Sequence, residues 1–173
     1  MHNPLFRARQ LIALFALKFI PSNNKLINLT PLVLKLAGFS EVSASSRIYP
    51  DIKIKGVRNL TIGDHTYIGA NVEIVGAFDS RVVIGERCDI SDHVSIVTGS
   101  HQICSAQRRA GRGISKNVEI KSGTWVGYRS TLLPGVVVGS GCIIGASSVV
   151  TKSIPDNVIA AGNPAAIIKR LTP

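Results

Sequence analysis

An aliphatic residue recurs at every sixth position from Val42 to Val150, with a few short gaps between runs. Ile, Val or Leu fills every one of these places: Val42, Ile48, Ile54, Ile62, Ile68, Ile74, Ile84, Ile90, Ile96, Ile114, Ile120, Val126, Leu132, Val138, Ile144 and Val150. The fifth position of the hexad is mostly Ser, Thr, Cys or a small aliphatic residue. The first and fifth positions are therefore predicted to point into a narrow interior. The second position is often glycine, as at Gly85 and Gly145, which predicts a turn with unusual φ/ψ there.

A six-residue period of this kind predicts a repeat architecture in which stacked turns pair their backbone groups with the coils above and below. Three hexads close one triangular coil, so the pattern predicts an all-β solenoid of about five coils over residues 42–156. A twelve-residue insertion at 102–113 interrupts it. Residues 1–41 are predicted to form two short helices, at 4–20 and 30–37. Residues 157–173 are predicted to carry a helix from Pro164 to Leu171, with Asn163 as its cap.

Composition narrows the class of protein. The chain has 173 residues, 45% of them hydrophobic and 17% charged, which fits one folded domain and excludes an extended disordered chain. Three widely spaced cysteines form neither a disulfide framework nor a CxxC zinc pattern, so a reducing compartment is expected. A net charge of +10 favours anionic partners. Nucleic acid is not expected among them, because no aromatic residue interleaves the arginines and no known module fits.

The apolar run from Leu11 to Leu17 is interrupted by Lys18 and is too short to span a bilayer as a helix. Two interpretations remain open. The helix either covers the end of the solenoid by packing, or it lies at an interface with anionic lipid.

Histidine is the residue most suited to accept a proton at neutral pH. His101 lies where the repeat breaks and the 102–113 insertion begins, a position typical of functional residues. His65 and His93 occupy the fourth position of their hexads but fall on different faces of successive coils, so no zinc site is expected.

Several motifs resemble the hexapeptide-repeat acyltransferases, and most closely their maltose/galactoside and polysaccharide O-acetyltransferase branch. They are Gly123-Thr-Trp-Val-Gly127, Leu133-Pro-Gly-Val136, Ile144-Gly-Ala-Ser-Ser-Val-Val-Thr-Lys152 and Ala161-Gly-Asn-Pro-Ala165. The resemblance covers roughly residues 34–170. It implies a left-handed parallel β-helix; the handedness comes from the family alone. It also implies a homotrimer with active sites at subunit interfaces, and acetyl-CoA as co-substrate without a metal.

The resemblance assigns roles to individual residues. His101 is implied as the general base, and the backbone N–H of Tyr128 as the oxyanion donor. The residues implied to contact the coenzyme are Trp125, Gly127, Ala146, Ser147, Thr151, Lys152, Lys169 and Arg170. Where many relatives carry another cation, this chain has Ala166, which Arg170 would compensate from a different helix face.

The acceptor side departs further from the family pattern. Relatives place an Asn and an acidic residue opposite the histidine, and here Asn71 and Asp79 lie two residues beyond the aligned positions. Arg108, Arg109 and Arg112 in the insertion are either a solvated face or a clamp for an anionic acceptor or coenzyme phosphate.

The expected function is acetyl-CoA-dependent O-acetylation of a sugar hydroxyl in bacterial surface polysaccharide biosynthesis. The reaction is expected in the cytoplasm, at the inner face of the membrane if the N-terminal helix touches lipid. The alternatives are an N-acetyltransferase of an amino sugar, a non-catalytic hexapeptide-repeat trimer and a metal hydratase.

Overall fold

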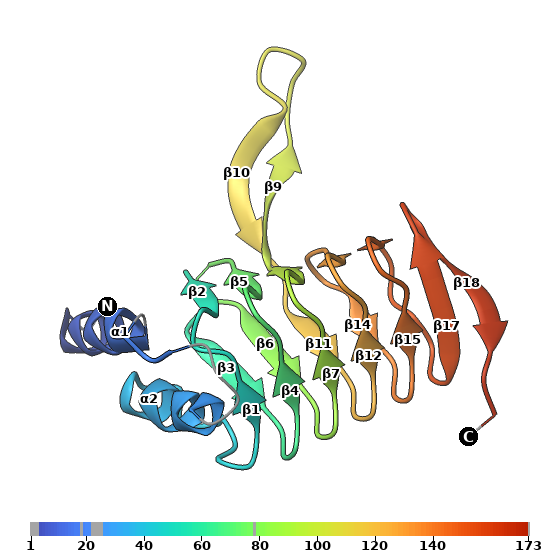
Figure 1. Cartoon of the computed structure of the whole chain (residues 1–173). Coiled ribbons are helices and arrows are strands. Elements are labelled where there is room, and N and C mark those ends of the chain that lie inside the picture. The colour runs from blue at the N-terminus through green and yellow to red at the C-terminus, as the bar shows by residue number, and fades with distance from the viewer. Residues whose placement is uncertain (1–3, 18, 22–25, 78, 173) are drawn as a thin grey trace.

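The main body of the protein is a parallel β-helix of three sheets, seen from the side in Figure 1. The computed structural model describes residues 4–17, 19–21, 26–77 and 79–172. The first sheet holds β1 (Arg47–Ile48), β4 (Tyr67–Ile68), β7 (Asp89–Ile90), β12 (Trp125–Val126), β15 (Ile143–Ile144), β17 (Val158–Gly162) and β18 (Ala165–Arg170). The second holds β2 (Lys53–Lys55), β5 (Glu73–Val75), β8 (Ser95–Val97), β13 (Thr131–Leu132) and β16 (Val149–Val150). The third holds β3 (Asn59–Ile62), β6 (Arg81–Ile84), β11 (Val118–Ile120) and β14 (Val137–Val138).

Each coil takes one strand from each sheet in turn, so the chain turns a corner after every strand. Successive coils pair in parallel with the hexads in register, as Ile68 with Ile90 and Val126 with Ile144. This arrangement fits the left-handed β-helix of hexapeptide-repeat proteins. The corners form three long edges of a prism. We call the edge between the first and second sheets edge 1, that between the second and third edge 2, and that between the third and first edge 3.

The interior matches the inward positions predicted from the hexad. The first-position residues on the coils are buried, and so are the fifth-position Ser, Thr and Cys residues. The prediction is wrong for Ile114, which lies in the hairpin strand Ala110–Ser115 and is only partly buried. Polar atoms at the fifth position bond to carbonyls of the next coil: Thr66 Oγ1 to Gly85 O at 2.7 Å, and Ser130 Oγ to Gly145 O at 2.8 Å. The small polar residues thus satisfy backbone acceptors inside the corners.

Two buried cysteines take the same position. The Cys88 thiol donates to the Lys121 carbonyl at 3.2 Å, and the Cys142 thiol to the Pro155 carbonyl at 3.0 Å. Burial raises the pKa of both thiols, which disfavours the reactive thiolate. They serve as core residues, as their place in the repeat predicted.

The second-position glycines have a different cause from the one predicted. They do not adopt positive φ; a Cβ at Gly85 would lie 2.6 Å from the Ser122 nitrogen, and one at Gly127 2.7 Å from the Ala146 nitrogen. Glycine is required there because successive coils approach closely. Positive φ occurs instead at the fourth position, as at His65 (56°) and His93 (60°). Histidine is among the residues that tolerate this conformation, which explains both histidines structurally.

The 102–113 insertion belongs to a β-hairpin that stands away from the prism at edge 2 (Figure 1). It consists of β9 (Gly99–Ile103) and β10 (Ala110–Ser115), which pair antiparallel with His101 opposite Gly113. The hairpin starts after β8 and returns to β11, so the solenoid resumes its register on either side.

The two ends of the solenoid are covered differently. At the N-terminal end, α1 (Pro4–Leu17) packs beside α2 (Thr30–Leu36), which follows a 3₁₀ turn at Ile27–Leu29 (Figure 1). No helix within the described residues has the length and apolar character needed to cross a bilayer.

The predicted C-terminal helix is wrong. Residues Ala165–Arg170 form strand β18, antiparallel to β17, with Gly162 at φ 106° and a cis Asn163–Pro164 peptide in the turn between them. The strand forms because β17 would otherwise end the first sheet with an unpaired edge.

Candidate active site

The three histidines on the β-helix lie on three different edges. His65 is in the turn between β3 and β4 on edge 3, and His93 is in the turn between β7 and β8 on edge 1. His101 is in the hairpin at edge 2. The described residues contain no group of three or more His, Cys, Asp or Glu arranged to hold a metal ion.

The His101 ring is held by the opposite strand of its hairpin. Its Nδ1 lies 2.9 Å from the carbonyl oxygen of Gly111. A carbonyl oxygen only accepts, so in this hydrogen bond Nδ1 carries the hydrogen. In the neutral ring Nε2 then carries the lone pair, which is the state required of a general base.

His101 opens onto a hollow of about 390 Å³ at the root of the hairpin. The hollow is lined by Gly76, Ala77, Asp79, Gly99, Ser100, His101, Gly113, Ile114 and Ser115. Three of these residues are glycines, which leaves the space beside the imidazole open. The hollow is thus shaped by two segments, the turn after β5 and the paired strands of the hairpin.

Asp79 is the predicted acceptor residue that the structure brings to His101. The Ser115 hydroxyl donates to Asp79 Oδ1 at 2.7 Å, which orients the carboxylate from the base of β10. A carboxylate accepts hydrogen bonds from hydroxyl groups. Sequence reasoning missed Ser115 and the Gly111 carbonyl, because both act only through the pairing of the hairpin.

Asn71 does not join this hollow. It lies at edge 1, in the turn between β4 and β5, where its φ of 54° is the left-handed conformation that asparagine tolerates. The backbone conformation of this turn therefore explains why asparagine stands at position 71 within one chain.

The three arginines of the insertion lie on the hairpin and are not among the residues that line the hollow. Arg109 Nη1 donates to the Cys104 carbonyl at 3.2 Å and so fastens the hairpin tip. Arg108, Arg109 and Arg112 are all exposed, and none has a carboxylate within ion-pair distance among the residues the structure describes.

Edge 1 carries the residues predicted around the thioester. Trp125 projects from β12, half-exposed, and its Nε1 donates to Ser91 Oγ at 3.1 Å. Gly127 and Tyr128 follow in the same turn, and Ala146 and Ser147 occupy the corresponding turn of the next coil. The ring of Tyr128 packs edge-on against His93, with centroids 5.5 Å apart.

The Tyr128 N–H has no hydrogen-bond acceptor among the described residues, and the neighbouring coil explains why. At the same hexad position, the Ala70 N–H bonds to Asp92 Oδ1 at 2.8 Å in the next coil, and the Ser140 N–H to Asp156 Oδ1 at 2.9 Å. Ala146 stands where those aspartates stand and offers no side-chain oxygen. The donor is left available for a ligand at edge 1.

The predicted phosphate contacts divide between two places. Thr151 and Lys152 are exposed at edge 2, in the turn after β16. The coil that contains β13 lies between this turn and the hairpin with His101. Lys169 and Arg170 lie on β18, opposite Ile159 and Val158, at the end of the first sheet. Because β18 is a strand, these two neighbours point to opposite faces rather than to different faces of a helix.

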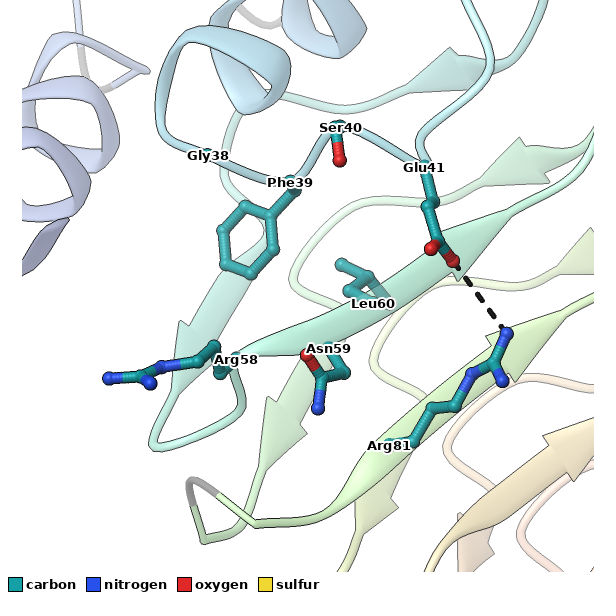
Figure 2. Close-up of a pocket in the computed structure, with 8 residues that line it drawn as sticks. All are labelled: Gly38, Phe39, Ser40, Glu41, Arg58, Asn59, Leu60 and Arg81. Atoms are coloured by element: carbon teal, nitrogen blue, oxygen red, sulfur yellow. Dashed lines mark ion pairs between the residues drawn. The ribbon is translucent and has the colours of Figure 1, made fainter. Parts of the chain in front are cut away.

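A second hollow, of about 250 Å³, lies near the N-terminal helices and contains none of the predicted site residues (Figure 2). It is lined by Gly38, Phe39, Ser40, Glu41, Arg58, Asn59, Leu60 and Arg81. An ion pair of 3.6 Å between Arg81 and Glu41 crosses it, and the Arg58 side chain points away from that pair in Figure 2. Glu41 and Arg81 neutralise each other, and the lining contains one further cation, Arg58.

Comparison with known proteins shows the family of this chain. The family model described as bacterial transferase hexapeptide (six repeats) matches residues 117–152, and that of the hexapeptide repeat of succinyl-transferase matches residues 59–91. The protein "Putative colanic acid biosynthesis acetyltransferase WcaF" of Escherichia coli is 31% identical over 137 residues, which is 79% of this chain and 72% of that protein. The chain belongs to the hexapeptide-repeat transferase family.

Two further relatives extend the likeness. The galactoside O-acetyltransferase of Lactococcus lactis is 33% identical over 134 residues, which is 77% of this chain and 64% of that protein. The alignment thus spans just under two thirds of that relative. A solved structure of a galactoside acetyltransferase in complex with coenzyme A superposes with a TM-score of 0.76 at 26% identity, covering 98% of this chain and 82% of that one.

Proposed function

We propose that the protein is an acetyl-CoA-dependent O-acetyltransferase that acts on a sugar hydroxyl in the biosynthesis of a bacterial surface polysaccharide. The observation that carries the proposal is the arrangement at the hairpin. The Gly111 carbonyl bonds to His101 Nδ1, which leaves Nε2 to accept a proton, and His101 and Asp79 line the same open hollow. The relatives named for galactoside and colanic acid acetylation support a sugar as acceptor.

The mechanism follows from these groups. His101 Nε2 accepts the proton of the sugar hydroxyl as its oxygen attacks the thioester carbonyl, while Asp79 accepts a hydrogen bond from a neighbouring hydroxyl. A C–O bond forms and the carbonyl oxygen takes the negative charge, which the Tyr128 N–H stabilises. The C–S bond then breaks, and the CoA thiolate receives the proton from the His101 imidazolium.

The co-substrate would lie along edge 1, where backbone groups at Gly127, Ala146 and Ser147 follow one another near the Trp125 side chain. Its phosphates would contact the exposed cations Lys169 and Arg170. Thr151 and Lys152 lie at edge 2, so they would contact the phosphates from a neighbouring subunit. Asn71, at the same edge, would contact the acceptor.

A trimer is part of the proposal, because His101 and Tyr128 lie on different edges of the prism. A single chain presents its base on edge 2 and its oxyanion donor on edge 1. A threefold assembly in which edge 2 of one subunit faces edge 1 of the next would complete three equivalent sites. The hairpin arginines would then reach an anionic part of either substrate.

The proposal includes a cytoplasmic location for the reaction. Cys88, Cys104 and Cys142 are all unpaired in the structure, which agrees with a reducing compartment.

The test combines binding and turnover. Calorimetry should give micromolar binding of acetyl-CoA, near one per subunit, and a panel of sugars, nucleotide sugars and amino sugars should reveal the acceptor. His101→Gln should lower kcat at least about 100-fold while coenzyme affinity stays unchanged. His65→Asn, which alters a histidine on edge 3, is the matched control and should keep wild-type turnover. Near-normal turnover of His101→Gln would refute the assignment, and failure to bind acetyl-CoA would refute the function.

A further inference from the structure

The N-terminal helices expose an apolar surface that the solenoid does not cover. Leu11 and Ile12 are each 70% exposed, Phe15 is 59% exposed and Phe19 is 72% exposed. Phe15 and Phe19 pack edge-on against each other, with ring centroids 5.2 Å apart. We call these four residues the outer helical surface.

The inner side of the same helix is apolar as well. Leu17 is fully buried in the core, and Ala13 and Leu14 pack against it. α1 is therefore hydrophobic on both sides, which is the pattern of a helix that is covered on both sides. The solenoid covers the inner side and leaves the outer one facing solvent.

α2 adds exposed apolar side chains at the same end of the protein. Arg9 Nη2 donates to the Leu36 carbonyl at 3.2 Å, which fixes the last turn of α2 beside α1. Leu32 and Leu36 are also exposed, and the two helices lie side by side at the N-terminal end of the prism (Figure 1). Single exposed apolar residues are ordinary on protein surfaces, whereas several at one end of a protein indicate an interaction site.

Charge indicates what would cover it. Residues 1–40 contain Arg7, Arg9, Lys18, Lys25 and Lys35 and not one Asp or Glu. A segment with cations and no carboxylates suits an anionic bilayer better than a partner protein of ordinary composition. On a bilayer, apolar side chains enter the headgroup boundary and cations stay with the lipid phosphates. Lys35 is exposed on α2 next to the exposed Leu36, so its ammonium group can contact lipid phosphates while α2 stays helical.

We propose that the α1–α2 unit docks the protein on a bilayer containing anionic phospholipid, with the outer helical surface inserted at the interface. The helices lie on the bilayer and do not cross it. Because they form one end of the prism, docking leaves the hairpin and edges 1 and 2 accessible. This inference stands on the helices alone and does not depend on the chemistry at His101.

The experiment is co-sedimentation of the full chain with vesicles of phosphatidylcholine alone or with one third phosphatidylglycerol, at low and high salt. Binding is expected only with the anionic vesicles, and each cation near the surface should contribute about fivefold, so that high salt releases the protein. Leu11→Ser/Phe15→Ser should weaken binding at least tenfold. Ile103→Ser, which removes a 90% exposed apolar side chain on the hairpin, is the matched control and should bind as wild type.

Circular dichroism and the midpoint of urea denaturation show whether the double variant is folded. Wild-type protein that ignores anionic vesicles, or a folded double variant that still binds them, would overturn the proposal. A third result would also overturn it. If wild-type protein does not bind vesicles and the double variant has a lower oligomeric mass in light scattering, the outer helical surface contacts a second copy of the chain.

Discussion

At the scale of single residues, the candidate site depends on pairs in which one partner is a backbone group or a small hydroxyl. His101 is oriented by the Gly111 carbonyl, and Asp79 by the Ser115 hydroxyl. The candidate base could be singled out from the sequence, because a histidine at a break in a regular repeat is conspicuous. Its orienting partners could not, since a glycine and a serine on the return strand look like any loop residues.

Ser115 is a positioning residue whose loss should affect acceptor binding rather than chemistry. Ser115→Ala removes the 2.7 Å hydrogen bond to Asp79. One such bond, largely solvent-exposed, contributes about 1 kcal/mol, so KM for the acceptor should rise about fivefold with kcat and coenzyme affinity little changed. Ser115→Thr keeps the hydroxyl and should restore KM. Ser105→Ala, at the hairpin tip, is the control, and equal KM values for Ser115→Ala and Ser105→Ala would show that Asp79 needs no support.

At the scale of elements, the spacing between coils explains the glycine pattern. The hexad predicted where glycine occurs but not why, since both a turn with positive φ and a close approach select glycine. The structure separates them: the second position packs against the next coil, and the fourth position adopts the left-handed conformation. The C-terminal segment shows the same limit, because its sequence suits a helix cap but its pairing with β17 decides for a strand.

A pair of glycine substitutions tests the spacing. A Cβ at Gly85 would meet backbone atoms of Ser122 at 2.6 Å, so Gly85→Ala should cost about 1–3 kcal/mol in the free energy of unfolding as the coils are forced apart. A Cβ at Gly113 meets nothing within 4 Å, so Gly113→Ala should unfold as wild type does. Urea denaturation measures both values. Equal urea midpoints for the two variants would mean that the coils can move apart at position 85 without loss of stability.

At the scale of the whole molecule, the prism separates the parts of the proposed site. Edge 2 presents His101 from the hairpin and Asp79 from the turn after β5, and edge 1 presents Trp125 and the Tyr128 N–H. The proposed trimer reunites them across a subunit boundary, and the outer helical surface is a separate feature at the end of the prism. Chemistry and docking therefore lie on different parts of the molecule and can be tested independently.

Mixed oligomers test the shared site. His101→Gln and Trp125→Ala should each be poorly active alone, but subunits mixed at equal amounts should recover about a quarter of wild-type activity, because some boundaries combine two intact edges. His101→Gln mixed with Asp79→Asn should recover nothing, since both changes lie on edge 2. Activity recovered in both mixtures would contradict a site shared between subunits. So would activity recovered in neither mixture, once mass measurements confirm that the subunits have exchanged.

The sequence by itself determined the solenoid, its inward positions, the site of the insertion and the position of the histidine that interrupts the repeat. It could do so because each coil contacts only its neighbours, so the same local rule repeats along the chain and is visible as a period. The tertiary structure alone decided the hairpin pairing that orients His101, the approach of Asp79 and Ser115, the C-terminal strand and the side of α1 left uncovered. These depend on which segments meet in space, and a periodic pattern contains no record of contacts made outside its own period.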